Sequence, residues 1–148
     1  MTLIEFLIKA KENTYADGMK YKVSSTTPNS IDYHYEENDY IYHDTYFGSK
    51  EFYGEEIVYI KSLPIWHMKY KGRLLNGETT DIYNKVLKPA LKKIDNELPL
   101  RGPKIFMVGN YKYTFESIGT IENFDGIEKI YKKDKLVYEL ICQGGKIF

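Results

Sequence analysis

Residues 39–72 read DYIYHDTYFGSKEFYGEEIVYIKSLPIWHMKYKG, and residues 110–144 read NYKYTFESIGTIENFDGIEKIYKKDKLVYELICQG. With a one-residue slip in a loop, the two segments align tyrosines, glycines and a glutamate, and apolar residues match where identity fails. A repeat of this length is one supersecondary unit, so it decides the fold. We interpret the chain as a single domain with an internal repeat, its halves at about residues 1–75 and 79–148. Chance similarity between two tyrosine-rich β segments is the alternative.

Each copy of the repeat has the pattern of four short antiparallel strands, because apolar and polar residues alternate between turn residues. The predicted strands are residues 31–36, 40–47, 56–61 and 65–71 in the first half and residues 105–108, 111–118, 128–132 and 136–143 in the second. Paired glycines such as Gly54 and Gly126 are interpreted as residues where strands begin or end.

A helix is predicted before each set of strands. Thr2 and Glu5 fit a capping box, and an apolar stripe follows, so residues 3–13 should be helical. A second apolar stripe predicts a helix over residues 81–97, in which Pro89 should cause a kink. The sequence thus predicts an α+β fold: a helix plus a four-stranded antiparallel meander, twice, with pseudo-two-fold symmetry, two main helices and up to eight strands. Residues 15–30 are expected to form an irregular arm.

Composition excludes several classes of protein. The chain has 148 residues, 21 basic against 21 acidic side chains, and one cysteine. The zero net charge gives no field that would attract a polyanion, so we expect no direct nucleic-acid partner. We also expect no disulfide, no metal and no cofactor, because no Cys/His cluster has zinc-ligand spacing and no glycine-rich phosphate loop occurs. No apolar run is long enough to span a membrane, so a cytoplasmic protein without a membrane partner is expected.

Aromatic residues on two predicted strands could line either a core or a ligand pocket. Asp44 and Tyr46 are two residues apart on one predicted strand and so share a face. Trp66, Met68 and Tyr70 have the same spacing on another predicted strand. The simpler interpretation is that these rings pack beneath the helices. Asp44 supports the pocket hypothesis, because a carboxylate pointing into an aromatic face needs a partner or a ligand.

Two further residues are candidates for such a pocket. Glu55 and Glu56 are adjacent, so on a strand they point to opposite faces, and Glu55 is the more site-specific of the two because the repeat has no counterpart to it. Arg101, in a turn after the second helix, could clamp a carboxylate or cap that helix. The predicted ligand-binding residues are therefore Asp44, Tyr46, Glu55, Trp66, Met68, Tyr70 and Arg101, with no residue assigned as catalytic.

Several stretches together carry a family resemblance. They are FLIKAK at residues 6–11, DTYFG at residues 44–48, FYGEE at residues 52–56, PIWHMKYKG at residues 64–72 and RGP at residues 101–103. The chain resembles the DUF5680 domain, a bacterial family of uncharacterised function, over nearly its whole length. That resemblance implies association with regulators that carry an XRE-type helix-turn-helix, and it implies no catalytic residues. With the first helix expected from Thr2, we expect no DNA-reading domain within this chain.

Three functions follow as hypotheses. The first is a non-enzymatic sensing or interaction domain that binds a small molecule or a protein through the aromatic face. The second is a small hydrolase or isomerase that uses His43, Asp44, Glu55 and Arg101, which requires these side chains to converge. The third is a complex-forming protein, which requires a large exposed apolar patch. A homodimer is left open.

Overall fold

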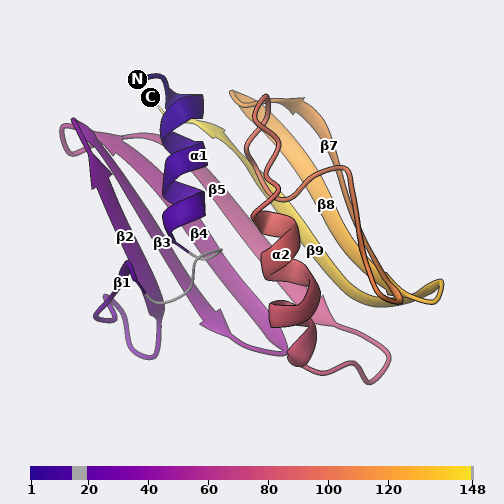
Figure 1. Cartoon of the computed structure of the whole chain (residues 1–148). Helices are drawn as coiled ribbons and strands as arrows, with labels where there is room; N and C mark the ends of the chain where they lie inside the picture. The colour runs from indigo at the N-terminus through magenta and orange to yellow at the C-terminus, as the bar shows by residue number, and fades with distance from the viewer. Residues whose placement is uncertain (15–19, 148) are drawn as a thin grey trace.

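A computed structural model describes residues 1–14 and 20–147, and its main feature is one nine-stranded antiparallel sheet (Figure 1). The spatial order of the strands is β1-β2-β3-β4-β5-β9-β8-β7-β6. The strands are β1 (Lys22–Val23), β2 (Ile31–Glu37), β3 (Tyr40–Gly48), β4 (Glu51–Ile60), β5 (Leu63–Leu74), β6 (Ile105–Val108), β7 (Tyr111–Thr120), β8 (Asn123–Lys132) and β9 (Lys135–Lys146). Each strand pairs with its sequence neighbour except at the centre, where β5 pairs with β9.

The helices all cover one face of the sheet, which we call the inner face; the other is the outer face (Figure 1). Helix α1 (Leu3–Asn13) begins where predicted, because the Thr2 hydroxyl accepts a hydrogen bond from the Glu5 amide and the Glu5 carboxylate accepts one from the Thr2 amide. Its buried face of Phe6, Leu7 and Ala10 packs on the strands.

The second helical segment is shorter than predicted. A π-helix η2 (Tyr83–Leu87) leads into α2 (Lys88–Leu91), where residues 81–97 were expected to be one helix. Pro89 has no amide hydrogen and its ring clashes with the preceding turn, so the helix widens there. Beyond α2, the Asp95 carboxylate accepts hydrogen bonds from the amides of Glu97 and Leu98. Such local bonds compete with helix continuation.

The predicted fold class is wrong: the molecule is one nine-stranded antiparallel sheet with two short helices, not an α+β fold with two main helices and eight strands. Part of the error is the ninth strand, β1, which lies in the segment predicted as an irregular arm, and part is the interpretation of the glycines. Gly54 and Gly126 lie inside β4 and β8 rather than at strand ends, because the side chains of Tyr70 and Phe115 occupy the space where a Cβ would stand. The strands therefore run on to ten or twelve residues.

The two sets β2–β5 and β6–β9 share strand order and direction. Both third strands carry an irregularity, after Val58 in one set and after Ile130 in the other. At the centre, Tyr70 on β5 pairs with Cys142 on β9. Cys142 is also the residue that the predicted repeat aligns with Tyr70. A two-fold axis between the halves requires this self-complementary register. The internal repeat, and with it the division into halves, stays a prediction.

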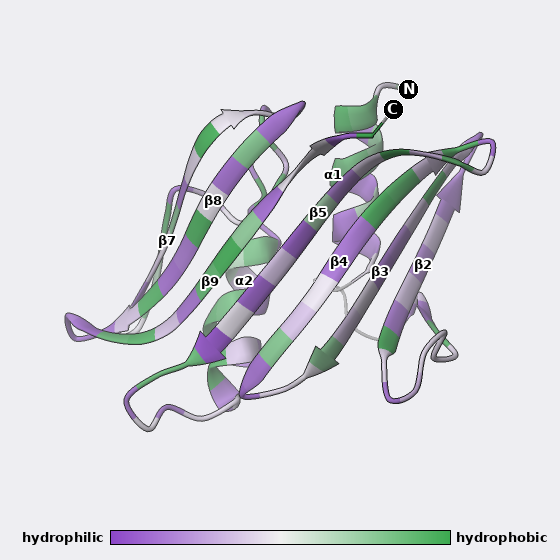
Figure 2. Ribbon diagram, turned by 180° about the vertical axis from the view of Figure 1, so that it is seen from behind, coloured by the Kyte–Doolittle hydropathy of each residue, from purple (hydrophilic) through white to green (hydrophobic). Residues whose placement is uncertain are grey.

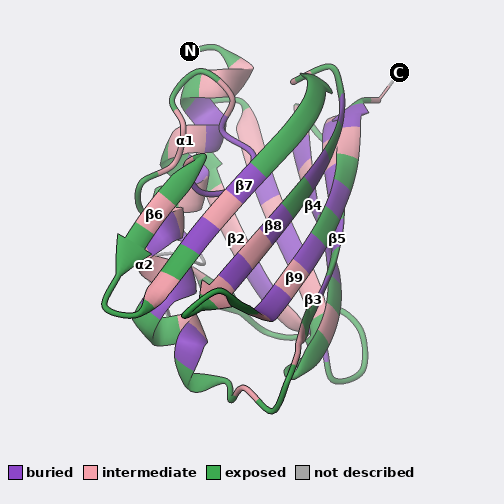
Figure 3. Cartoon of the chain, turned by 90° about the vertical axis from the view of Figure 1, so that its right-hand side faces the viewer, coloured by how far each residue is buried: buried purple, intermediate pink, exposed green. Residues whose placement is uncertain are grey.

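The core lies between the helices and the inner face of the sheet. Burial alternates along β4, β5, β8 and β9, as expected of a sheet covered on one side only (Figure 3). Seen from behind, hydrophilic and hydrophobic residues follow one another along the strands (Figure 2). Within the predicted arm, residues 22 and 23 form the short edge strand β1, and residues 15–19 lie outside the described residues.

Candidate functional site

A partly open cavity of about 280 Å³ lies between the inner face and the helical segments. The strands contribute Ile31, Tyr42, Asp44, Tyr46, Gly48, Phe52, Glu56 and Tyr70 to its wall. The turn between β3 and β4 contributes Ser49, and the helical side and its connections contribute Lys11, Thr14, Thr80, Tyr83, Leu87, Leu91, Ile94, Leu100 and Arg101. The wall is therefore apolar toward η2 and α2 and polar toward the sheet, a combination typical of small-molecule sites.

One end of the cavity holds a buried ion pair between α1 and the sheet. The Lys11 ammonium lies 2.6 Å from a carboxylate oxygen of Glu56 and also donates to the Leu100 carbonyl, at 2.6 Å. Both side chains are at most one-tenth exposed. Because each charge is matched, this pair fastens α1 to β4 and leaves no net charge at that wall.

A second buried pair lies nearby and also has an internal partner. Two nitrogens of the Arg101 guanidinium donate hydrogen bonds to the Glu128 carboxylate, Nε at 3.0 Å and Nη2 at 2.7 Å. The Glu128 carboxylate also accepts hydrogen bonds from the hydroxyls of Tyr113 and Tyr138. Arg101 is therefore a carboxylate clamp, as one of the two sequence hypotheses proposed, and the carboxylate that it holds belongs to β8.

Asp44 is the buried acid of this wall that carries no salt bridge. Its oxygen accepts a hydrogen bond of 2.6 Å from the Tyr70 hydroxyl, and the residue is 3% exposed. Burial raises the pKa of the Asp44 carboxyl to about 8, and the negative charge of Glu56, its direct partner on β4, adds to this effect. The raised pKa favours the protonated form of Asp44, which has a proton to donate in a hydrogen bond to a partner in the cavity.

Strands β6–β9 pair in the same pattern as β2–β5, so their register offers a comparison for these positions. Glu56 lies opposite Asp44, and Glu128 lies opposite Phe115; Gly54 lies opposite Tyr70, and Gly126 lies opposite Cys142. Where the first half has an acid and a tyrosine, the second half thus has a phenylalanine and a cysteine, both buried. Burial raises the pKa of the Cys142 thiol to about 12, so it is an apolar core residue, as predicted.

Thr14, at the end of α1, adds a second polar group to the cavity. The Thr14 side chain is fully buried, and its hydroxyl lies near that of Tyr42. Among the residues that the structure describes, none makes a well-formed hydrogen bond with the Thr14 hydroxyl oxygen. A buried hydroxyl without a well-formed hydrogen bond costs free energy, which a ligand atom in the cavity would recover.

The structure brings four of the seven predicted ligand-binding residues to the cavity: Asp44, Tyr46, Tyr70 and Arg101. Trp66 and Met68 share the inner face but are fully buried in the core and do not line the cavity. Glu55 is exposed on the outer face, where it pairs with Thr45, and its neighbour Glu56 occupies the wall instead.

Sequence reasoning missed Lys11, Thr14, Glu56 and Tyr83 as cavity residues. Glu56 could have been found from strand pairing, because a residue paired directly with Asp44 must share its face. Tyr83 fixes the rim, since its hydroxyl donates to the Ser49 carbonyl at 2.6 Å. Nothing in the local sequence places η2 over that turn.

The four residues of the hydrolase or isomerase hypothesis do not share one face of the sheet. Asp44 and Arg101 line the cavity. The His43 side chain lies on the outer face of β3, where it hydrogen-bonds Asp32. Glu55 lies on the outer face as well. The sheet therefore separates two of these side chains from the other two.

The pKa of Asp44 gives a testable pH dependence of stability. An unfolded Asp loses its proton near pH 3.8 and the folded one near pH 8, so the free energy of unfolding should fall as pH rises between these values. The decrease amounts to at most about 1.4 kcal/mol per pH unit. We expect urea denaturation at about pH 5 and about pH 8 to show a smaller decrease for Asp44→Asn than for the unsubstituted protein. Glu55→Gln, at an exposed site, should keep the full decrease; equal decreases in all three proteins would contradict the shift.

The fold and cavity define a class: a single antiparallel sheet covered by helices on one face, with a small-molecule-sized cavity between the layers. Residues 44–147 match the family model described as "Domain of unknown function (DUF5680)", so the chain belongs to this family, as its sequence motifs predicted. Searches of curated proteins and of solved structures gave no significant match. In the part of the chain that the structure describes, no helix has the length and apolar character needed to cross a bilayer.

Proposed function

We propose that this protein is a non-enzymatic binding domain that takes a small, uncharged and largely apolar molecule into the inner-face cavity. The observation that carries the proposal is the buried pair of Asp44 and Tyr70 at the cavity wall. A buried carboxyl costs stability, and the second half of the same sheet fills the equivalent positions with Phe115 and Cys142. The polar pair is thus not a requirement of the scaffold, which is what a ligand-binding role explains.

The charges of the wall indicate an uncharged ligand. Lys11 is matched by Glu56 and Arg101 by Glu128, while the raised pKa of Asp44 favours its uncharged form. A charged molecule would enter without a counter-charge and would lose its hydration. A neutral hydrogen-bond acceptor, such as a carbonyl oxygen or a ring nitrogen, could instead accept a hydrogen bond from the protonated Asp44 carboxyl.

The shape of the wall gives the orientation. The acceptor would lie toward Asp44 and the buried hydroxyl of Thr14, and the apolar body would lie against Leu87, Leu91 and Ile94. Binding of this kind requires no chemistry, as in a sensing domain. It would tie α1 and the η2–α2 segment to the sheet at once, because both contribute to the wall.

A library of uncharged aromatic amides, ketones and nitrogen heterocycles tests the proposal by thermal shift and ligand-observed NMR. A compound at one hundred times its dissociation constant should raise the free energy of unfolding by about 2.7 kcal/mol. Ile94→Trp, which fills the cavity, and Asp44→Phe, which copies the second half, should each weaken binding at least tenfold.

Ile118→Trp is the matched control, because Ile118 is 80% exposed and does not line the cavity. It should bind every hit with unchanged affinity. Hits that bind equally well to Ile94→Trp would place the ligand elsewhere. A library with no hits would leave the cavity without the ligand class proposed.

The complex-forming hypothesis finds less support on the outer face. Ile127 and Ile141 lie directly opposite each other there and are 44% and 58% exposed. Glu116 flanks this pair on one side and Lys71 on the other. Because charged side chains flank the two isoleucines, the apolar patch that they form is smaller than a protein interface requires.

A further inference from the structure

Two histidines face each other on the outer face, away from the cavity. His34 on β2 and His43 on β3 are direct cross-strand partners, and their Nδ1 atoms are 3.3 Å apart. The β2–β3 hairpin brings them together, although nine residues separate them in the sequence. The third histidine, His67 on β5, pairs with Ile57, which in turn pairs with His43, so His67 lies in the same row but two strands away.

A carboxylate holds the far nitrogen of each imidazole. His43 Nε2 lies 2.7 Å from Asp32, and His34 Nε2 lies 2.7 Å from Glu36. A carboxylate accepts hydrogen bonds, so both Nε2 atoms carry hydrogen. In the neutral tautomers that these partners select, the Nδ1 atom of each ring carries a lone pair and faces the Nδ1 atom of the other ring.

Two lone pairs held this close repel each other, and a cation bound by both nitrogens would relieve that repulsion. Imidazole nitrogens bind Zn²⁺ at about 2.0 to 2.1 Å, and a tetrahedral angle between two such bonds puts the nitrogens about 3.3 to 3.4 Å apart. We propose that His34 and His43 form a binding site for a divalent transition-metal ion through their two Nδ1 atoms. Hydrogen bonds from carboxylates to the outer nitrogens of ligating histidines are the usual second layer of such sites.

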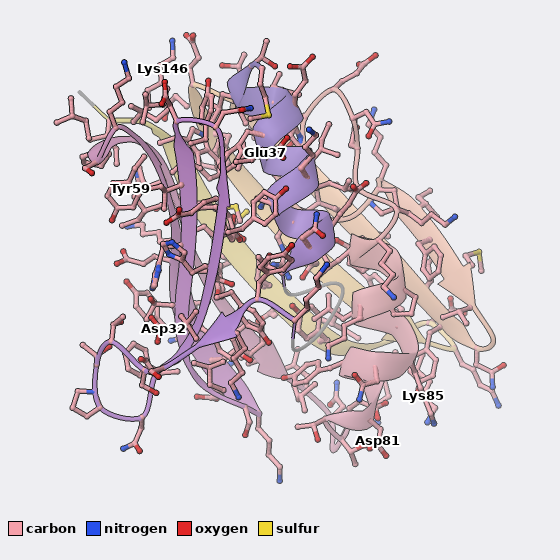
Figure 4. The ribbon with its side chains drawn as sticks, turned by 60° about the vertical axis from the view of Figure 1, so that its left-hand side comes forward. Asp32, Glu37, Tyr59, Asp81, Lys85 and Lys146 are labelled. Carbon is pink, nitrogen blue, oxygen red and sulfur yellow. The ribbon has the colours of Figure 1, made fainter. Side chains whose placement is uncertain are left out.

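The carboxylate behind His43 is more buried than the one behind His34. The Asp32 side chain is fully buried on the outer face, at the edge of the sheet far from α1 (Figure 4). Its carboxylate accepts hydrogen bonds from the hydroxyls of Ser30, Thr26 and Thr45 in addition to its contact with His43. Asp32 is thus held in place behind His43. Glu36 is 61% exposed, so His34 can adjust to the ion.

The ion class follows from the ligands. Imidazole nitrogens suit Zn²⁺, Ni²⁺ and Cu²⁺ and do not suit Mg²⁺ or Ca²⁺. Among the described residues, no group of three or more His, Cys, Asp and Glu side chains surrounds one point. The protein therefore supplies two ligands and water supplies the rest, which makes the ion exchangeable.

Titration of the tag-free protein with Ni²⁺ or Zn²⁺ by isothermal calorimetry tests the site. We expect one ion per chain, and no binding of Mg²⁺ under the same conditions. His34→Gln and His43→Gln should each weaken binding at least tenfold, while His67→Gln, the matched control, should leave it unchanged. Circular dichroism confirms that each variant is folded.

A second pair of variants separates a ligand site from adventitious binding. Glu36→Gln removes the carboxylate behind His34 without removing a ligand, and should weaken binding about tenfold or more. Glu55→Gln removes an exposed carboxylate elsewhere on the outer face and should have no effect. Absence of binding, or equal loss in His67→Gln, would overturn the proposal and leave a shared proton as the bridge between the two imidazoles.

Discussion

Replacing Glu128 with leucine is expected to lower the free energy of unfolding by about 3 to 5 kcal/mol, the cost of leaving a buried charge without its partner. Glu128 is fully buried and accepts two hydrogen bonds from Arg101. Two tyrosine hydroxyls, of Tyr113 and Tyr138, lose their acceptor as well. Urea denaturation monitored by circular dichroism measures the change.

The double variant Arg101→Leu/Glu128→Leu is the internal control for that prediction. It removes both charges, so it should be more stable than the single variant, because no buried ion is left unpaired. Glu116→Leu, at an exposed position of β7, should change stability by less than about 0.5 kcal/mol. A single Glu128 variant as stable as the Glu116 variant would show that the cluster does not support the fold.

Trp66→Ala is the second substitution with a large expected effect, a loss of about 3 to 5 kcal/mol in the free energy of unfolding. The indole is fully buried, stacks on Phe124 with ring centroids 5.8 Å apart and donates to the Ile121 carbonyl at 2.9 Å. The substitution leaves a cavity and an acceptor without its donor. For a marginally stable domain this is a large part of the total.

Tyr53→Ala is the matched control, because this aromatic side chain is 49% exposed on β4. It should cost much less than the Trp66 substitution. Because Trp66 does not line the cavity, the folded fraction of Trp66→Ala should still bind cavity ligands. A well-folded Trp66→Ala protein that has lost only ligand binding would assign the indole to the ligand site instead of the core.

Local patterns decided much of the sheet. The alternation along the strands identified most of them and the face on which each side chain lies, which is why Asp44, Tyr46 and Tyr70 were expected to share a face. The capping box placed the start of α1 correctly. Such features depend on residues close in sequence, so they can be read without the fold.

The glycines and Pro89 show where that reading failed. A glycine in a strand pattern ends a strand in one context and allows an aromatic side chain to cross it in another, and only the neighbouring strand decides between them. Gly54 is of the second kind, because Tyr70 on β5 fills the space above it. At Pro89 the sequence predicted a kink, but the length of the helix depended on the turn at Asp95 as well.

The sequence by itself determined the antiparallel strands, the family to which the chain belongs and the burial of Asp44 among aromatic residues. Only the tertiary structure decided that Glu56 rather than Glu55 reaches the cavity, that Arg101 is occupied by Glu128, and that His34 meets His43. The physical reason is that alternation fixes a side chain's face relative to its own strand, whereas its partners depend on register and on which elements cover that face. Register and coverage are set by contacts between residues far apart in the chain, such as the pairing of β5 with β9.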